Sequence, residues 1–210
     1  RNIAVENGLN GFSLADESAM NYLHGNLAAA NELYGFSISD ESQDNLLHKN
    51  HSTGNVLSGF TVLDASRNLL SRNEATENGG AGFSRVSATN NNLQRNTASG
   101  NKSGGYVLTE SVENELSFNM ATNNEGDGFA LDTSDGNKLK GNTAIGNDDD
   151  GFDFLSSDDN TIVGNTAREN SSDGFSVTSS DNNLVKRNQS FDNADWGFLV
   201  DAVLGNLFDD

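Results

Sequence analysis

The sequence repeats a single unit, and the period of that unit limits the fold more than any other feature. A glycine followed by an aromatic residue begins at positions 11, 35, 59, 82, 105, 128, 151, 174 and 197. The spacing is 24 residues twice and then 23 residues six times, so nine units account for nearly all 210 residues. Self-similarity at a fixed period of about 20 to 50 residues is typical of proteins whose units stack on one another.

Three asparagine positions recur in every unit. The apolar residues between them alternate with polar ones at period two, which indicates short, half-buried β-strands, and Asn and Gly mark the turns. Equivalent residues of stacked parallel strands lie about 4.8 Å apart, so each Asn amide can donate to one neighbour and accept from the next. The sequence therefore predicts an all-β solenoid of nine coils, with asparagine ladders in its turns. The three sets are Asn2, Asn26, Asn50, Asn73, Asn96, Asn119, Asn142, Asn165 and Asn188; Asn7, Asn31, Asn55, Asn78, Asn101, Asn124, Asn147, Asn170 and Asn193; and Asn21, Asn45, Asn68, Asn91, Asn114, Asn137, Asn160, Asn183 and Asn206.

The apolar positions of the unit predict four columns of core side chains. An aliphatic residue recurs from Leu23 to Val185, an aromatic residue from Phe12 to Phe198, a further apolar residue from Leu14 to Val200, and alanine or serine from Ala4 to Ser190. We expect the small column where opposite walls of the solenoid are closest. Because each coil buries its apolar face against its neighbours, a single coil is not expected to fold alone.

Arg85 interrupts the third apolar column, between Val62 and Leu108. A buried guanidinium without a partner is too costly, so two alternatives remain. Either Arg85 is buried with a partner, or the chain bulges and Val86 points inward in its place. We favour the bulge, and bulges often accompany functional sites.

The repeat resembles that of right-handed parallel β-helix proteins. These include the periplasmic copper-accessory family of nitrous oxide reductase, the mannuronan C5-epimerases and the pectate-lyase-like enzymes. The resemblance covers all nine units and implies a right-handed, single-stranded parallel β-helix with coils of 23–24 residues. We expect residues 1–210 to form one domain, a segment of a longer chain, because neither end carries a capping helix or a polar terminal repeat. Uncapped coils would also allow end-to-end self-association.

Composition excludes several classes of function. The chain has 12 basic and 31 acidic residues, a net charge of −19, so nucleic acid is not an expected partner. It has no cysteine, which excludes disulfides, a thiol nucleophile and cysteine-based zinc sites. No apolar run is long enough to span a membrane. We expect an extracellular or cell-surface location, with the periplasm as the alternative.

The negative charge is concentrated in the second half of the chain. The last 105 residues hold 5 basic and 21 acidic groups, a net charge of −16, whereas the first 105 residues carry −3. Asp127, Asp150 and Asp173 each precede the Gly of a Gly–aromatic pair and should form a column, with Asp148 and Asp149 close by. Stacked carboxylates repel one another, and raised pKa values or a bound cation relieve the repulsion. Ligands that are all oxygen favour Ca²⁺ over zinc or copper. Two interpretations remain: a solvated acidic face, which we favour, and a Ca²⁺ site formed by these residues.

A smaller basic row lies in the first half. Lys49, Arg72 and Arg95 precede an Asn of the first set in three successive coils, and all three histidines lie in the same half. A row of cations at one coil spacing would suit an anionic polysaccharide such as a polyuronate, although we favour the interpretation that it is ordinary surface charge. Trp196 presents a ring on which a pyranose could stack, so these four residues are the carbohydrate-binding candidates.

The resemblance to the epimerases can be tested residue by residue. That family carries a motif of the form Y-G-F-D-P-H, whose Tyr, Asp and His contribute to the active site. The most similar stretch here reads D-G-F-D-F-L from Asp150 to Leu155, so that Asp153 is matched but Tyr and His are missing. The resemblance would make Asp153 and Asp150 the catalytic candidates if the chain were an enzyme. Proton abstraction at C5 needs a base and a donor on opposite faces of the sugar, which Asp153 alone cannot supply.

Three interpretations follow. We favour a non-catalytic structural or surface-adhesive β-helix module, for which calcium and carbohydrate are the candidate ligands. The first alternative is a polysaccharide-active enzyme, a uronate lyase or an epimerase-like enzyme, or a fragment of one. The second is a periplasmic accessory protein that presents acidic residues to a metal. The constant coil length favours the module, because no unit carries an inserted loop that would wall a substrate cleft.

Overall fold

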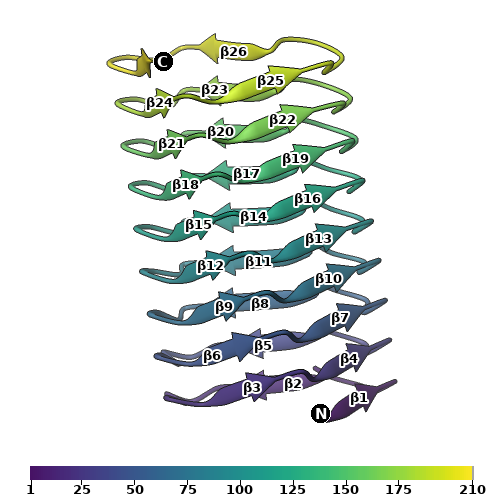
Figure 1. Cartoon of the computed structure of the whole chain (residues 1–210). Helices are drawn as coiled ribbons and strands as arrows, with labels where there is room; N and C mark the ends of the chain where they lie inside the picture. The colour runs from purple at the N-terminus through teal and green to yellow at the C-terminus, as the bar shows by residue number, and fades with distance from the viewer. Residues whose placement is uncertain (210) are drawn as a thin grey trace.

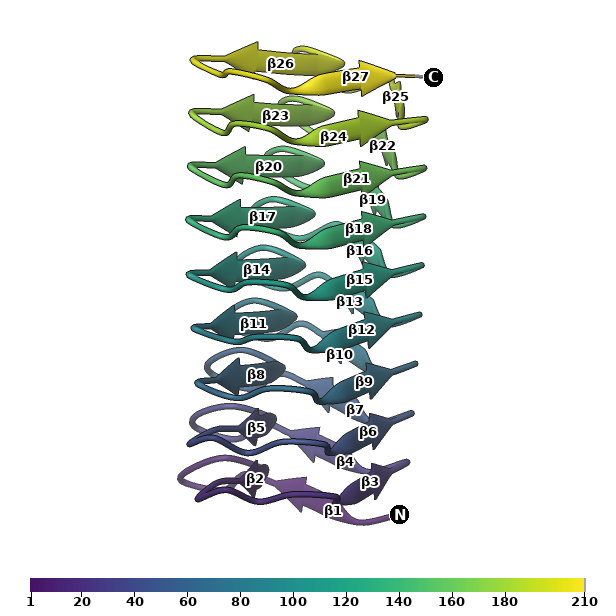
Figure 2. The ribbon, with the colours of Figure 1, turned by 90° about the vertical axis from the view of Figure 1, so that its left-hand side faces the viewer.

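The computed structural model describes residues 1–209, which form 27 β-strands and no helix. Nine coils of three strands stack along one axis (Figure 1), and the two termini lie at opposite ends of the stack (Figure 2). No helix that could cross a membrane occurs among the described residues. The predicted parallel β-solenoid of nine coils is therefore confirmed.

Strands three apart in the chain pair in parallel, so each of three sheets contains every third strand. Sheet 1 comprises β1 (Ile3–Val5), β4 (Leu27–Ala29), β7 (His51–Thr53), β10 (Glu74–Thr76), β13 (Thr97–Ser99), β16 (Met120–Thr122), β19 (Thr143–Ile145), β22 (Thr166–Arg168) and β25 (Gln189–Phe191). Sheet 2 comprises β2 (Phe12–Leu14), β5 (Phe36–Ile38), β8 (Phe60–Leu63), β11 (Phe83–Val86), β14 (Tyr106–Thr109), β17 (Phe129–Asp132), β20 (Phe152–Leu155), β23 (Phe175–Thr178) and β26 (Phe198–Asp201). Sheet 3 comprises β3 (Tyr22–His24), β6 (Leu46–His48), β9 (Leu69–Ser71), β12 (Asn92–Gln94), β15 (Glu115–Ser117), β18 (Lys138–Lys140), β21 (Thr161–Val163), β24 (Leu184–Lys186) and β27 (Leu207–Asp209).

The side chains that point inward form the predicted columns. The aromatic rings from Phe12 to Phe198 stack with centroids 4.6–4.9 Å apart and with interplanar angles of 3–7°. The aliphatic column from Leu47 to Ile162 is almost completely buried. The strand pairing places equivalent residues side by side, and this register aligns the columns along the axis.

The glycine of each Gly–aromatic pair faces the column of small residues. A Cβ atom at Gly128 would lie 2.6 Å from the Cβ of Ala144 and 2.6 Å from the carbonyl oxygen of Gly151. Both atoms belong to packed coils and cannot move away, so only glycine allows this close approach. The small column therefore packs closely against the start of sheet 2, and its position between opposite walls stays a prediction.

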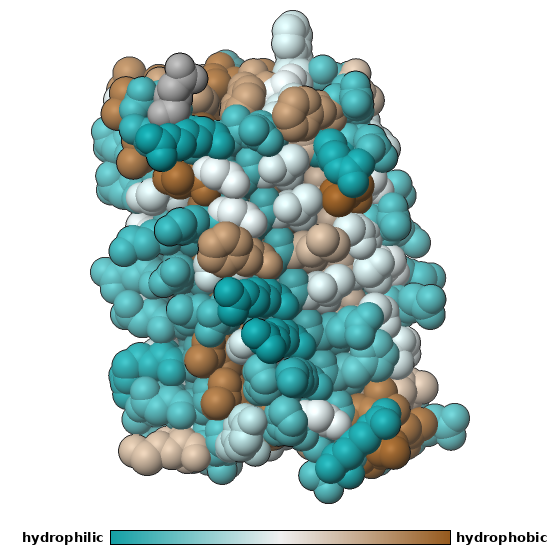
Figure 3. Space-filling view, in the orientation of Figure 1, coloured by the Kyte–Doolittle hydropathy of each residue, from teal (hydrophilic) through white to brown (hydrophobic). Residues whose placement is uncertain are grey.

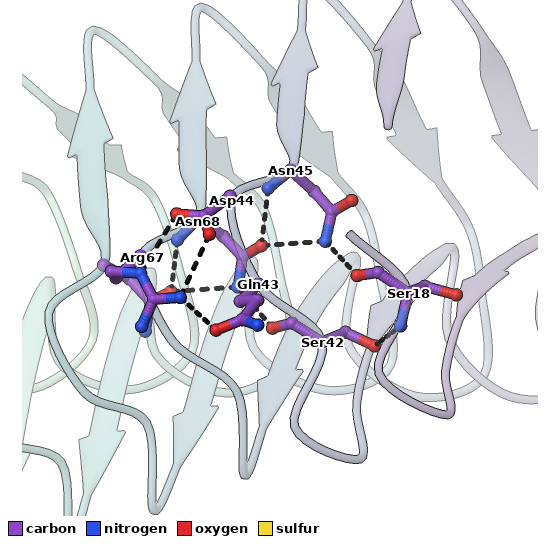
Figure 4. Close-up of polar contacts among 8 residues, drawn as sticks. Ser18, Ser42, Gln43, Asp44, Asn45, Arg67 and Asn68 are labelled. Atoms are coloured by element: carbon purple, nitrogen blue, oxygen red, sulfur yellow. Dashed lines mark hydrogen bonds and ion pairs between the residues drawn. The ribbon is translucent and has the colours of Figure 1, made fainter. Parts of the chain in front are cut away.

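The asparagine sets occupy the three turns of each coil and form continuous ladders. Figure 4 shows one of them: the backbone N–H and the side-chain Nδ2 of Asn45 both donate to Oδ1 of Asn68 at 3.0 Å. The same Nδ2 donates to the carbonyl oxygen of Ser18 at 2.8 Å. The ladders thus pair buried backbone groups that the short strands leave without partners.

Replacing a ladder residue in the middle of the stack should weaken the fold. Buried Asn119 accepts the backbone N–H of Asn96 at 2.9 Å and donates to the carbonyl oxygen of Leu93 at 2.8 Å. Asn119→Ala leaves both groups unpaired, so we expect the free energy of unfolding to fall by ~1–3 kcal/mol. Urea unfolding followed by circular dichroism measures the change. Asn92→Ala is the control, because the Oδ1 atom of Asn92 has no hydrogen-bond partner; equal effects of the two substitutions would contradict the role of the ladder.

Arg85 does not bulge outward, so our prediction there was wrong. Strand β11 keeps its register, with Arg85 beside Val62 and Leu108, and Arg85 is 1% exposed whereas Val86 is half-buried. The alternative, that Arg85 is buried with a partner, is correct for the burial, but the three guanidinium nitrogens have no hydrogen-bond partner. The hydroxyl of Tyr106, which is also buried, has none either. Burial lowers the pKa of Arg85 to about 9. The strand alternation, which places this position inward, overrides the polarity of the side chain.

Hydrophilic side chains cover most of the surface in the view of Figure 3, and hydrophobic ones lie near the two ends of the stack and in small patches between them. The outermost coils have a neighbour on one side only, so their apolar side chains are less covered. The exposed apolar residues of these coils include Ile3, Val5, Leu9, Leu204, Leu207 and Phe208.

Candidate functional site

Acidic residues gather where the chain passes from sheet 1 to sheet 2. Asp127 precedes β17, and Asp149 and Asp150 precede β20, so the parallel register stacks these turns one coil apart. A carboxylate oxygen from each of the three residues lies within 4.8 Å of the others. We call Asp127, Asp149 and Asp150 the acidic triad. Asp148 and Asp173, which the sequence also suggested as metal ligands, lie outside it.

The backbone of successive coils holds this column of aspartates in place. The N–H of Asp150 donates to Oδ1 of Asp127 at 3.0 Å, and the N–H of Asp173 donates to Oδ1 of Asp150 at 2.7 Å. In the first coils Asn10 has the same role, because its Oδ1 accepts the N–H of Tyr34 at 3.2 Å. A neutral amide therefore suffices for the hydrogen bond, and the charge of the aspartates is not needed for the ladder.

Burial and mutual repulsion raise the pKa values of this cluster. Burial, followed by the charges of Asp153 and Asp149, raises the pKa of Asp127 to about 7, and the hydrogen bond from the Asp150 N–H opposes the shift. Burial also raises the pKa values of Asp150 and Asp173. The cluster thus holds more negative charge than its surroundings stabilise, and either a proton or a cation relieves this strain.

Asp153 lies beside the triad on β20, between Ala130 and Ser176 of the neighbouring strands. Burial, followed by the charges of Asp150 and Asp149, raises its pKa to about 6, while a hydrogen bond with the Ser176 side chain opposes the shift. Sequence reasoning missed this hydrogen bond. The signal was present, because Ser176 follows Asp153 by one coil period of 23 residues.

The carbohydrate-binding candidates do not form one surface. Lys49, Arg72 and Arg95 are exposed and lie one coil apart in the turn from sheet 3 to sheet 1, with φ angles of 53°, 54° and 55°. Trp196 is 65% exposed but lies several coils away, in the turn from sheet 1 to sheet 2. Its backbone N–H donates to Oδ1 of Asp173 at 2.7 Å, so Trp196 extends the acidic column and not the basic row.

Two family models match the sequence. Residues 86–208 match the family described as "Periplasmic copper-binding protein (NosD)", and residues 1–144 match the family described as "Right handed beta helix region". No curated protein sequence matches the chain.

Several solved structures share the fold at low sequence identity. The periplasmic alginate epimerase AlgG is 20% identical with a TM-score of 0.66, over 85% of this chain and 50% of its own. The Azotobacter vinelandii mannuronan C-5 epimerase AlgE6 A-module is 16% identical with a TM-score of 0.71, over 92% and 59% of the two chains. The enzymatically active domain of bacteriophage CBA120 tailspike protein 2 is 10% identical with a TM-score of 0.79, over 93% and 37%. The aligned region thus spans about 60% of each of these proteins or less.

The segment that matches the copper-binding family does not have the donors that copper prefers. Copper ions favour imidazole, thiolate and thioether ligands. Residues 86–208 contain no histidine and no cysteine, and Met120 is their single methionine. The acidic triad offers carboxylate oxygens alone, which are ligands for a hard cation such as Ca²⁺.

Proposed function

Because this chain belongs to the right-handed β-helix family and carries the NosD repeat region, we propose that it is a non-catalytic, polysaccharide-binding β-helix module whose acidic triad binds Ca²⁺. The observation that carries the proposal is the position of Asp127, Asp149 and Asp150, whose carboxylate oxygens lie within 4.8 Å of one another while burial raises the pKa of Asp127 to about 7. Ca²⁺ accepts six to eight oxygen ligands in flexible geometry. It would therefore have coordination positions left for a ligand after binding the triad.

The charge of the chain limits how an anionic polysaccharide could bind. A net charge of −19 repels an anionic polysaccharide, so such a polymer would bind the acidic half only through a bridging cation. Structurally similar proteins are alginate and mannuronan epimerases by name, which supports a polyuronate as the ligand. Such a role fits an extracellular, cell-surface or periplasmic location.

Titration calorimetry with Ca²⁺ tests the triad. The natural chain should release or absorb heat as one ion binds, and Asp150→Asn should abolish the signal because it removes a central ligand. Asp158→Asn is the matched control, since Asp158 accepts the Asp181 N–H at 2.6 Å in the neighbouring turn but lies outside the triad. No binding at millimolar Ca²⁺, or equal loss in both variants, would contradict the proposal.

One observation favours the enzymatic alternative. Asp127 and Asp153, with pKa values raised to about 7 and about 6, could exchange protons near neutral pH, and efficient general acids and bases have pKa values near the working pH. Against it, the Tyr and His of the epimerase motif are absent, and no coil carries an inserted loop.

We therefore expect no turnover of alginate or polygalacturonate in the presence of Ca²⁺. Absorbance of unsaturated products detects lyase activity, and proton NMR detects epimerised residues. Turnover that disappears in Asp153→Asn, but not in Asp158→Asn, would establish the enzymatic alternative and overturn the non-catalytic part of the proposal.

A further inference from the structure

Three cations and an aromatic ring follow one another along a single corner of the solenoid. Lys49, Arg72, Arg95 and Phe118 each precede an Asn of the first set in four successive coils, in the turn from sheet 3 to sheet 1. All four are exposed and have φ angles of 53–56°, while the Asn that follows each is buried in its ladder. The parallel register of the preceding strands places them one strand spacing apart, about 4.8 Å. We call these four residues the corner row.

No carboxylate neutralises the cations of the corner row. Within residues 1–209, none of Lys49, Arg72 and Arg95 forms an ion pair. Glu74 follows Arg72 by two residues, but its Oε2 lies 3.2 Å from Nδ1 of His51 instead. The corner row therefore keeps three positive charges, at a fixed spacing, for an anion from outside the chain.

The next coil holds the ring of Phe118 in place at the end of the row. The corner position of that coil is Gly141, and a Cβ atom there would lie 2.8 Å from a ring carbon of Phe118. The ring thus lies over the glycine backbone, while 55% of Phe118 stays exposed. A ring held in this way loses little conformational freedom on binding. It offers a preformed apolar surface on which the face of a pyranose can stack.

The three cations lie in the half of the chain where the negative charge is weakest. The first 105 residues carry a net charge of −3, whereas the last 105 residues carry −16. Salt screens the more distant charges, because the Debye length is about 8 Å at physiological ionic strength. An anion at this corner is therefore attracted by the corner row more strongly than it is repelled by the acidic half of the molecule.

We propose that the corner row binds an anionic polysaccharide directly, along the axis of the solenoid and without a bridging cation. One coil advances by roughly the length of one sugar unit, so acidic groups along the polymer can meet successive cations while a pyranose stacks on Phe118. A guanidinium donates two parallel hydrogen bonds to an oxyanion such as a carboxylate, and a sulfate group offers the same kind of acceptor. The corner row and the acidic triad lie at different corners of the coil, so this proposal does not depend on the Ca²⁺ site.

The experiment is biolayer interferometry at low salt, with alginate, dextran sulfate or neutral dextran immobilised and with EDTA present to exclude Ca²⁺. We expect alginate, dextran sulfate or both to bind, neutral dextran not to bind, and the affinity to fall as the salt concentration rises. The polymer that binds more tightly identifies the oxyanion as carboxylate or sulfate. Arg72→Gln and Arg95→Gln should each weaken binding about two- to five-fold, as for exposed ion pairs. Phe118→Ala should weaken it about five-fold.

Arg67→Gln is the matched control for the loss of one positive charge. Arg67 is exposed and has a φ of 52°, but it lies in the turn from sheet 2 to sheet 3 and pairs with Asp44 at 3.0 Å. This variant should keep the affinity, and so should Asp127→Asn, which removes a member of the acidic triad. Equal losses in Arg67→Gln and Arg72→Gln, or no binding of either charged polymer in EDTA, would overturn the proposal. Tighter binding of single-stranded DNA than of both polymers would also overturn it.

Discussion

The Asp127→Asn variant is expected to be more stable than the natural chain at about pH 8, and to lose the response to Ca²⁺. The amide should keep the hydrogen bond from the Asp150 N–H, as Asn10 does for Tyr34. It removes a carboxylate whose pKa is raised from 3.8 to about 7. A shift of about three pKa units corresponds to a ceiling of about 4 kcal/mol. Because Asp127 is only half-buried and solvent screens its charge, we expect a gain of ~2 kcal/mol.

The raised pKa of Asp127 determines how the stability of the natural chain changes with pH. Between about pH 4 and pH 7 the folded chain keeps the Asp127 proton that the unfolded chain has already released, so the stability of the natural chain should fall as the pH rises. The variant lacks this proton, and its advantage should disappear at about pH 4, where both states of the natural chain are protonated. Thermal unfolding at several pH values measures both curves.

At high pH, Ca²⁺ should make the natural chain more stable than the Asp127→Asn variant. An ion that binds only the folded state stabilises it by about 2.7 kcal/mol at 100 times its dissociation constant. The natural chain should gain this stabilisation above the pKa of Asp127 and much less below it, because protons compete for the same oxygens. Asp158→Asn should respond to Ca²⁺ as the natural chain does. A calcium response that persists in Asp127→Asn would contradict the site.

The repeat could be predicted from the sequence because its period sets the register. Asn119 and Asn142 are one repeat apart, so strand stacking places their amides in contact. The period alone therefore predicts which residues pair between coils. The same reasoning placed Asp127 above Asp150. It could not place Asp149 in the triad and Asp148 outside it, because that difference depends on side-chain direction within a turn and not on spacing along the chain.

The pKa values could not be predicted in the same way. They depend on how deeply each carboxylate is buried, and neighbouring turns decide that depth. Asp153 is the clearest example, since its spacing predicts the outward position between Ala130 and Ser176 but not the burial that raises its pKa to about 6. This burial matters for the functional interpretation. An exposed aspartate is a poor proton donor at neutral pH, whereas a buried aspartate with a raised pKa can donate a proton there.

The largest stabilisation is expected from Arg85→Leu. The substitution replaces a fully buried guanidinium, none of whose nitrogens has a partner, by the residue type that occupies the same column at Leu108 and Leu131. Replacing buried charged groups with apolar residues of fitting shape stabilises proteins by roughly 1–4 kcal/mol. We expect about 3 kcal/mol here, because no hydrogen bond is lost. Urea unfolding measures the free energy, and the variant should bind Ca²⁺ unchanged because the triad lies in other coils.

Tyr106→Phe tests the effect of the buried Tyr106 hydroxyl separately from that of the Arg85 guanidinium. Every other ring in the aromatic column is phenylalanine, and the Tyr106 hydroxyl has no partner, so the substitution should stabilise the chain by ~1–2 kcal/mol. Arg85 and Tyr106 interact electrostatically, so the two gains should not be additive. A loss of stability in Arg85→Leu would mean that the guanidinium has hydrogen-bond acceptors in solution. It would contradict the account of an uncompensated charge, because removing a donor is costly only when its acceptors are then left unpaired.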